Sequence, residues 1–146
     1  IVRSDGLDEL RAKLTGKRAE PAVTRFLDRG AIYIQGRARA AAPVDTGALR
    51  NSIAVETTSK NERSIGTNKE YAPYVEFGTR PHWPPIAAIT PWAKRHGAEP
   101  FAVAKGISIA GTKKQEYMKP AALEGESFVK SLVPVLAAEI EAAYAQ

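Results

Sequence analysis

The chain has 146 residues, of which 44% are hydrophobic and 25% charged, as is ordinary for a soluble globular protein. It contains no cysteine, which excludes disulfides, thiolate metal sites and thiol nucleophiles. The net charge of +5 favours a polyanionic neighbour such as DNA, but it also fits an ordinary solvated surface because the basic residues are spread along the chain. We expect a single domain over residues 1–146, with no membrane-spanning segment and no signal peptide.

Two helices are predicted in the N-terminal part of the chain. Leu7, Leu10 and Leu14 recur at helical spacing and predict a short amphipathic element over residues 5–14. Over residues 21–42, apolar side chains recur every three or four positions, which predicts a long helix. Pro43 is expected to end this helix, because the residue before a proline is disfavoured in the helical region.

A hairpin is expected next. From Leu49 the apolar period changes to two, which predicts a half-buried strand. A polar turn, S-K-N-E, follows, and the segment R-S-I-G-T-N can return antiparallel to the first strand. Residues 71–77 fit either a third strand or a short helical turn, since Pro73 argues against a central strand.

The second half of the chain predicts further helices. Residues 80–85, R-P-H-W-P-P, predict a stiff loop, and a compact helix is expected to begin with Thr90 as N-cap and to stop at Gly97. Another helix is expected from Glu99 to Gly111. The chain then predicts an amphipathic C-terminal helix with a kink at Pro134. Its apolar face comprises Phe128, Leu132, Leu136, Ile140 and Ala143.

Together these elements predict an α+β fold. We expect a small antiparallel β-sheet packed against a long N-terminal helix and a C-terminal helix. A helical excursion over residues 80–114 is expected to interrupt the middle of the chain.

The tripeptide Asp45-Thr46-Gly47 also occurs at the active site of aspartic proteases, where two carboxylates share a proton. Such a site needs a hydrophobic strand leading into it, whereas the preceding residues here are R-A-R-A-A-A-P. A turn accounts for every residue: Pro43 stops the helix, Asp45 caps backbone N–H groups in an Asx-turn, and Gly47 supplies a positive φ. We interpret Pro43, Asp45, Thr46 and Gly47 as a structural turn, with the protease as the alternative.

No other catalytic or metal-binding pattern is found in the sequence. His82 and His96 lack a third ligand at metal spacing, and no serine lies in a Gly-x-Ser-x-Gly setting. Glu76 is interpreted as a buried or interfacial hydrogen-bond acceptor that fixes the segment 71–79. We therefore expect no enzyme activity, cofactor, metal ion or small-molecule substrate.

Three segments carry a resemblance to a known family. They are A-P-V-D-T-G-A-L-R-N-S-I (42–53), Y-A-P-Y-V-E-F-G-T (71–79) and Y-M-K-P-A-A-L-E-G (117–125). In this order, with helices on both sides, they resemble the signature blocks of tailed-phage neck proteins. These are the Hong-Kong-97-type head–tail connector or tail-completion proteins, which include relatives similar to the Z protein of phage lambda. The third block departs from the common Pro-Phe-x-x-Pro-Ala form, because Tyr117 and Met118 stand there.

The resemblance implies a structural virion protein that forms a ring, usually six-fold, at the head–tail junction. The implied partners are further copies of the chain, connector or stopper and tail-tube proteins, and genomic DNA that passes without sequence-specific contact. The implied location is the virion, after assembly in the bacterial host cytoplasm. Whether the ring lies on the connector side or the tail side stays open.

Two sets of residues are then assigned to surfaces. Lys113 and Lys114, in a flexible loop after Gly111, are candidates for a DNA-lined lumen. A non-specific nucleic-acid-binding module is the alternative function, because residues 21–42 and 94–114 are rich in arginine and lysine. The candidates for contacts with other subunits or partners are Tyr71, Tyr74, Glu76, Phe77, Trp83 and Trp92.

Overall fold

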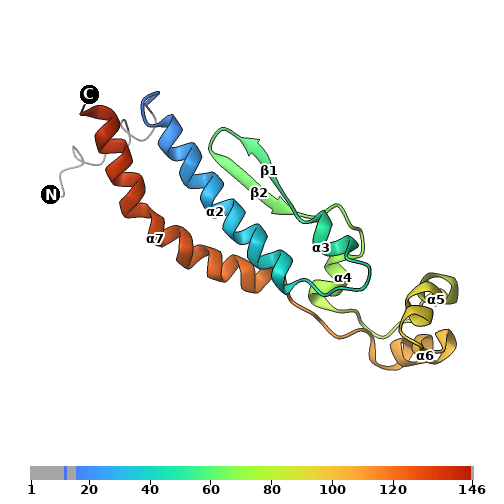
Figure 1. Cartoon of the computed structure of the whole chain (residues 1–146). Coiled ribbons are helices and arrows are strands. Elements are labelled where there is room, and N and C mark those ends of the chain that lie inside the picture. Colours follow the sequence, from blue (N-terminus) through green and yellow to red (C-terminus); the bar gives the residue numbers. More distant parts are fainter. Residues whose placement is uncertain (1–11, 13–15, 146) are drawn as a thin grey trace. The chain divides into compact units, whose positions relative to one another are not determined.

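The computed structural model describes Ala12 and residues 16–145 (Figure 1). The helices and strands, in chain order, are α2 (Glu20–Ala41), α3 (Ala48–Ser52), β1 (Ala54–Ser59), β2 (Glu62–Gly66), α4 (Ala72–Phe77), α5 (Ile86–Arg95), α6 (Pro100–Ala110) and α7 (Met118–Tyr144). The predicted α+β fold is confirmed, because a two-stranded antiparallel sheet accompanies the two long helices α2 and α7. The amphipathic element predicted over residues 5–14 lies, apart from Ala12, outside the described residues.

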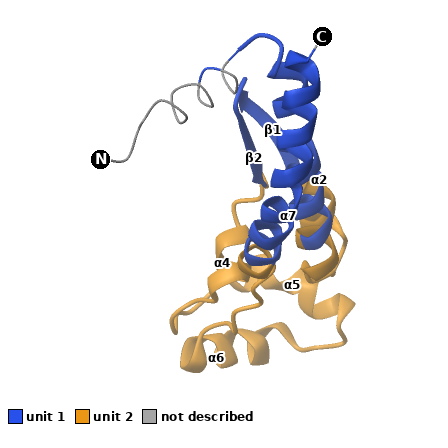
Figure 2. Ribbon diagram, turned by 90° about the vertical axis from the view of Figure 1, so that its left-hand side faces the viewer, with its two compact units in different colours: residues 1–37, 54–66, 121–146 blue, residues 38–53, 67–120 orange. Residues whose placement is uncertain are grey.

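The chain divides into two compact units, which Figure 2 shows in two colours. Unit 1 contains most of α2, the β1–β2 hairpin and α7 from Ala121 onward. Unit 2 comprises residues 38–53 and 67–120, and so contains α3, α4, α5 and α6. The turn at residues 43–47 and every residue that the sequence assigns to a contact surface or a DNA lumen lie in unit 2. The single-domain organisation stays a prediction.

In unit 1, α2 and α7 pack against each other through apolar side chains. The rings of Tyr33 and Phe128 stack with their centroids 4.0 Å apart. Gly125 allows a close approach of the two helices, since a Cβ there would overlap the side chain of Ile34. Nearer the ends of the helices, a second cluster comprises Ala19, Ala22, Leu136, Ile140 and Tyr144.

The β1–β2 hairpin is tied to α2 within the same unit. Arg63 Nε lies 2.7 Å from Asp28 Oδ1, and only 8% of the Arg63 side chain is exposed. Lys60 Nζ lies 2.6 Å from Glu20 Oε2. Because the Arg63 guanidinium is largely withdrawn from water, its pairing with Asp28 fixes the hairpin more firmly than a fully exposed pair would.

The predicted strand from Leu49 is wrong in its first residues. The chain from Ala48 to Ser52 forms the short helix α3, and β1 begins only at Ala54. Leu49 and Ile53 are both buried, and their four-residue spacing fits one face of a helix as well as it fits alternation along a strand. The return strand is confirmed as β2, with Val55 opposite Ile65.

The first helix of the excursion begins earlier than predicted. Helix α5 starts at Ile86 after Pro85, so Thr90 is not its N-cap. The Thr90 hydroxyl instead donates to the Ile86 carbonyl at 2.7 Å, a bond that threonine makes inside helices. The pair Pro84-Pro85 indicates the true start of α5, before Thr90, because proline at this point presets the backbone for the first helical turn.

The remaining helices follow the prediction. Residues 71–77 adopt the helical alternative as α4. Helix α6 is capped by the Glu99 carboxylate, which accepts from Ala102 N at 2.7 Å, and it ends at Gly111. Helix α7 runs through Pro134, which lies inside it.

Candidate functional site

The Glu76 carboxylate caps the start of α7. It accepts three backbone hydrogen bonds: Tyr117 N donates to Oε2 at 2.8 Å, Met118 N to Oε2 at 3.0 Å, and Lys119 N to Oε1 at 2.9 Å. Glu76 is 5% exposed and Tyr117 is 1% exposed, so the arrangement is almost fully buried. These bonds satisfy three of the backbone donors that every helix start leaves without an intrahelical partner.

Two opposing effects act on the pKa of Glu76. Burial raises the pKa of the carboxyl, because it penalises the charged form. The hydrogen bonds from Tyr117, Met118 and Lys119 together outweigh burial and hold the pKa below its ordinary value. Glu76 is therefore a charged structural acceptor inside the subunit, and its assignment as a direct contact with another subunit is corrected.

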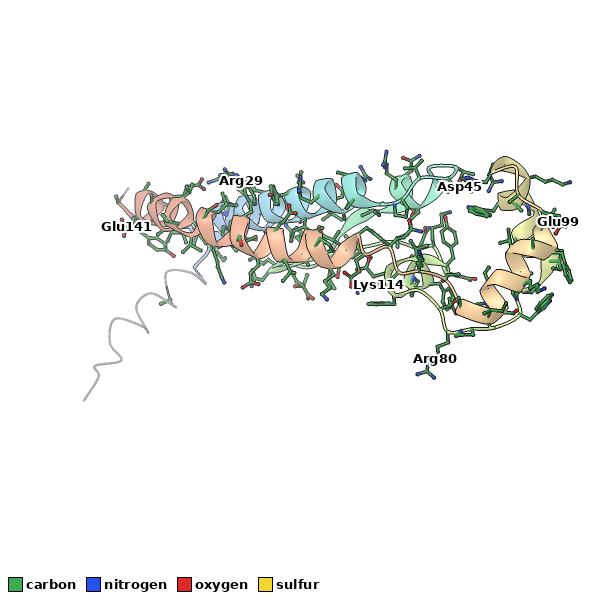
Figure 3. All side chains as sticks on the ribbon, turned by 90° about the horizontal axis from the view of Figure 1, so that it is seen from below. Arg29, Asp45, Arg80, Glu99, Lys114 and Glu141 are labelled. Carbon is green, nitrogen blue, oxygen red and sulfur yellow. The ribbon has the colours of Figure 1, made fainter. Side chains whose placement is uncertain are left out.

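The side chain of Asp45 in the turn at residues 43–47 bonds to residues at the end of α5, and it does not cap the backbone N–H groups of the turn. The carboxylate of Asp45, which is labelled in Figure 3, accepts from Arg95 Nε at 2.9 Å and also from Arg95 Nη2. His96 Nε2 lies 3.2 Å from Asp45 Oδ1, and its ring stacks on Trp92 with centroids 4.4 Å apart. The expected Asx-turn is therefore wrong: Asp45 links the turn to the C-terminal end of α5. Sequence spacing gives no signal of this pairing, because the partners are 50 and 51 residues apart.

Gly47 has a positive φ of 81°, which is the backbone conformation expected for the turn. A Cβ at this position would meet only Asn51 Nδ2 at 3.6 Å, an ordinary contact. We therefore predict that Gly47→Val destabilises the fold through backbone strain alone, by about 2 kcal/mol. Asp45→Ala should have a smaller effect, because the Asp45–Arg95 pair is largely exposed to solvent. Thermal melts of both variants test this order, and equal stability of Gly47→Val and the parent would contradict it.

A backbone bridge between Thr79 and Thr112, which we call the stem, joins the two ends of the helical excursion. Thr79 N donates to Thr112 O at 3.2 Å, and Thr112 N donates to Thr79 Oγ1 at 3.0 Å. Gly78 and Gly111 flank this bridge, both with a positive φ. The stem fixes where the segment Thr79–Thr112 leaves and rejoins the rest of unit 2.

A mostly apolar groove of about 840 Å³ opens within unit 2. Its lining includes Tyr71, Tyr74 and Pro84 on one part of the chain, and Trp92 and Ile107 from α5 and α6. Arg80 and Lys113 contribute the positive charges of the lining. A concave apolar surface that carries a few charged groups is typical of a binding surface.

The aromatic side chains that the sequence predicts as contacts with other subunits or partners are exposed. The five aromatic candidates are between 42% and 73% exposed, namely Tyr71, Tyr74, Phe77, Trp83 and Trp92. Two further side chains of α6, Phe101 and Ile109, are also exposed and were not predicted from the sequence. The sequence of α6 does indicate such exposed apolar residues, because the helix contains only one charged residue, Lys105. Such an accumulation of large apolar side chains on the surface of one unit indicates a contact surface.

The two lysines proposed for a DNA lumen differ in their surroundings. Lys114 Nζ lies 3.1 Å from Glu116 Oε1, whereas Lys113 has no carboxylate partner among the described residues. Both side chains are exposed, and Figure 3 marks Lys114. Their charge is therefore available at the surface, in the loop that follows the stem.

The geometry provides no second carboxylate for an aspartic-protease dyad at Asp45, since its described partners are Arg95 and His96. Within the described part of the chain, no three His, Cys, Asp or Glu side chains are grouped to hold a metal ion. No helix among residues 16–145 is both long and apolar enough to span a membrane.

Comparison with known proteins gives one match. A family model described as "Bacteriophage HK97-gp10, putative tail-component" matches residues 7–78. This range contains all of the block 42–53 and nearly all of the block 71–79. No curated protein and no solved structure matches the chain.

Proposed function

Because residues 7–78 belong to the HK97-gp10-like family of phage tail components, we propose that the chain forms a ring at the head–tail junction of a tailed bacteriophage or prophage. The family match agrees with the resemblance in the first two blocks and supports a phage tail-related structural protein, while the third block, 117–125, lies outside the matched residues. The ring would complete or terminate the tail and join it to the DNA-filled head. A structural role of this kind requires no catalysis and no cofactor.

The exposure of the aromatic candidates carries this proposal. A subunit that acted alone would leave Tyr74, Phe77 and Trp83 more than half exposed to water. Burying large aromatic side chains is among the strongest contributions to protein–protein contacts. The groove supports the same conclusion, because it is built from the second family block and the excursion. We therefore propose that residues 71–79 and 80–114 contact neighbouring subunits or tail proteins.

The proposed partners are further copies of the chain, a connector or stopper protein, and the tail tube. The proposed location is the virion, with assembly in the cytoplasm of the bacterial host. Sedimentation velocity over a wide concentration range, with and without purified tail tubes, tests the assembly. We expect an oligomer that grows with concentration or on addition of tubes. A strict monomer that also ignores tail tubes would contradict the proposal.

Passage of DNA through the ring is the second part of the proposed function. A negative wall would repel the polyanion, so the lumen should be neutral or basic. The loop with Lys113 and Lys114 is exposed and follows Gly111, whereas the arginine-bearing helix α2 commits one face to packing. We propose that this loop lines the lumen without sequence-specific contacts.

Reversing both lysine charges tests the lumen. We predict that Lys113→Glu combined with Lys114→Glu leaves folding intact but reduces DNA retention and infectivity of assembled particles. The matched control is Lys94→Glu with Lys105→Glu, which makes the same charge change on α5 and α6. Normal DNA retention in the first variant would mean that the loop faces away from the DNA.

A further inference from the structure

The net charge of the chain is concentrated in one segment. Residues 79–114 contain six lysines and arginines and one glutamate, a surplus of +5 that equals the net charge of the whole chain. The one glutamate, Glu99, is engaged in capping α6. The rest of the chain is therefore balanced, and the helical excursion is the positive part of the molecule.

Most of these charges have no internal partner. Within residues 16–145, only Arg95 and Lys114 of the six form an ion pair, with Asp45 and Glu116 respectively. In contrast, basic residues of unit 1 such as Arg25 and Arg37 are paired with glutamates of α7. Arg80 lines the apolar groove, and in Figure 3 its side chain points away from the ribbon. The groove thus combines an apolar floor with an uncompensated positive charge.

The exposed side of α7 combines apolar residues with negative charge, and so complements the apolar, positively charged groove. The helix contains four glutamates and two lysines, so it is negative overall. We define the outer face of α7 as Leu123, Glu126, Lys130, Val133, Ala137 and Glu141, which are all exposed and recur at helical spacing. Within this face, Lys130 Nζ lies 2.6 Å from Glu126 Oε1, so the unpaired charge of the face is that of Glu141. Leu123 is 60% and Val133 50% exposed. Glu141, near the C-terminal end of the helix in Figure 3, has no ion-pair partner in the described part of the chain.

We propose that the outer face of α7 of a second copy of this chain occupies the groove of the excursion. Leu123 and Val133 would contact the apolar part of the groove, while Glu141, which has no ion-pair partner among the described residues, would face the positive excursion. The contact joins two different surfaces of the same protein, so it is heterologous, and repetition of such a contact closes into a ring where the rotation allows. This proposal rests on the proposed ring and specifies which surfaces build it.

The charges of the two surfaces favour the outer face of α7 as the occupant of the groove over the alternatives. Two excursions facing each other would bring together two segments of net charge +5, which repel. Phosphate groups of DNA would satisfy the positive charge but would leave the apolar groove in contact with water. An apolar helix face with an unpaired carboxylate satisfies both features, in the helix-in-groove mode of recognition.

Photo-crosslinking tests the contact directly, and the absence of cysteine makes site-specific labelling clean. His82→Cys places a single thiol on the groove lining, where it can carry a maleimide-linked benzophenone. The labelled full-length chain is mixed with a ¹⁵N-labelled parent chain, irradiated and analysed by mass spectrometry. Asn61→Cys, in the turn between β1 and β2, is the control site. Tyr74→Cys is a second groove position if the first variant fails to fold.

We expect ¹⁵N-labelled peptides within residues 123–141 to dominate the crosslinks from the benzophenone at position 82 and to be absent from the control. Crosslinks to residues 79–114 of the second copy, to other surfaces, or only to DNA or another virion protein would overturn the proposal. Absence of any intermolecular crosslink would overturn it too. If sedimentation still shows an oligomer in these cases, the ring survives and only the assignment of its surfaces fails.

Charge reversal provides an independent readout that leaves Lys113 and Lys114 unchanged. We expect Arg80→Glu and Glu141→Arg each to weaken self-association in sedimentation, and the two changes in one chain to restore part of it. Arg29→Glu, at an exposed arginine of α2 without an ion pair among the described residues, controls for the change in net charge. A double variant that associates no better than the single variants would contradict the charge complementarity.

Discussion

Replacing Glu76 with glutamine is expected to lower the free energy of unfolding by about 3 kcal/mol. The carboxylate accepts hydrogen bonds from the backbone N–H groups of Tyr117, Met118 and Lys119. Glutamine has one acceptor oxygen, and its NH₂ group would face donors, so at least one buried N–H would lose its partner. Urea unfolding of the parent and the variant measures the difference.

The control for this change is Glu70→Gln, which removes the same charge from an exposed side chain close by in the sequence. Its stability should stay close to that of the parent. If Glu76→Gln is as stable as Glu70→Gln, the start of α7 does not depend on the carboxylate.

The same residue should make stability depend on pH. The pKa of Glu76 is lower in the folded chain than its ordinary value, because three backbone hydrogen bonds outweigh burial. The folded state therefore gains stability above the unfolded pKa of about 4.3, and it loses this stability as pH falls through the lower folded pKa. The difference between the parent and Glu76→Gln should be full at neutral pH and should shrink on acidification. An equal difference at both ends of the range would contradict the assignment.

Replacing Gly111 with alanine is expected to destabilise unit 2 by about 3 kcal/mol. Gly111 has φ 72° and ψ −162°, a region of backbone space that essentially only glycine occupies. A Cβ there would also overlap the carbonyl oxygen of Thr79, and backbone cannot move aside as a flexible side chain can. Gly78, with φ 71° and ψ −176°, is constrained in the same way, since a Cβ on it would lie 2.5 Å from Thr112 O.

Hydrogen exchange can localise this effect. In Gly111→Ala the amides of Thr79 and Thr112 should lose protection, because the substituted residue forces the stem apart. Gly106→Ala is the matched control: Gly106 lies inside α6, and a Cβ there meets nothing within 4 Å. This control should be more stable than the parent by about 0.5–1 kcal/mol, through helix propensity alone. Unchanged protection of Thr79 and Thr112 in Gly111→Ala would show that the stem tolerates a side chain.

Much of the fold follows from local signals in the sequence. The long helix before Pro43, the return strand, and the cap and stop of α6 at Glu99 and Gly111 each depend on residues within a few positions of one another. The wrong predictions of helix and strand boundaries arise where the same residues fit two local patterns. Leu49 and Ile53 fit either period, and Pro85 and Thr90 both signal a helix start.

The contacts of the site could not be predicted in this way, because they join residues far apart in the sequence. Glu76 could be identified as a buried acceptor, but its three donors lie 41 to 43 residues away. The partner of Asp45 lies 50 residues away, and no spacing rule connects them. The exposed aromatic residues were foreseen better, since Trp83 and Tyr74 lie among prolines that limit regular packing.

We propose that the chain forms a ring that joins the head and tail of a phage particle. Electron microscopy of purified tail tubes incubated with the gold-labelled protein can show whether such a ring assembles on the tail. We expect a ring of several subunits at one end of each tube. Tubes without bound protein at their ends, or protein bound only along their sides, would contradict it.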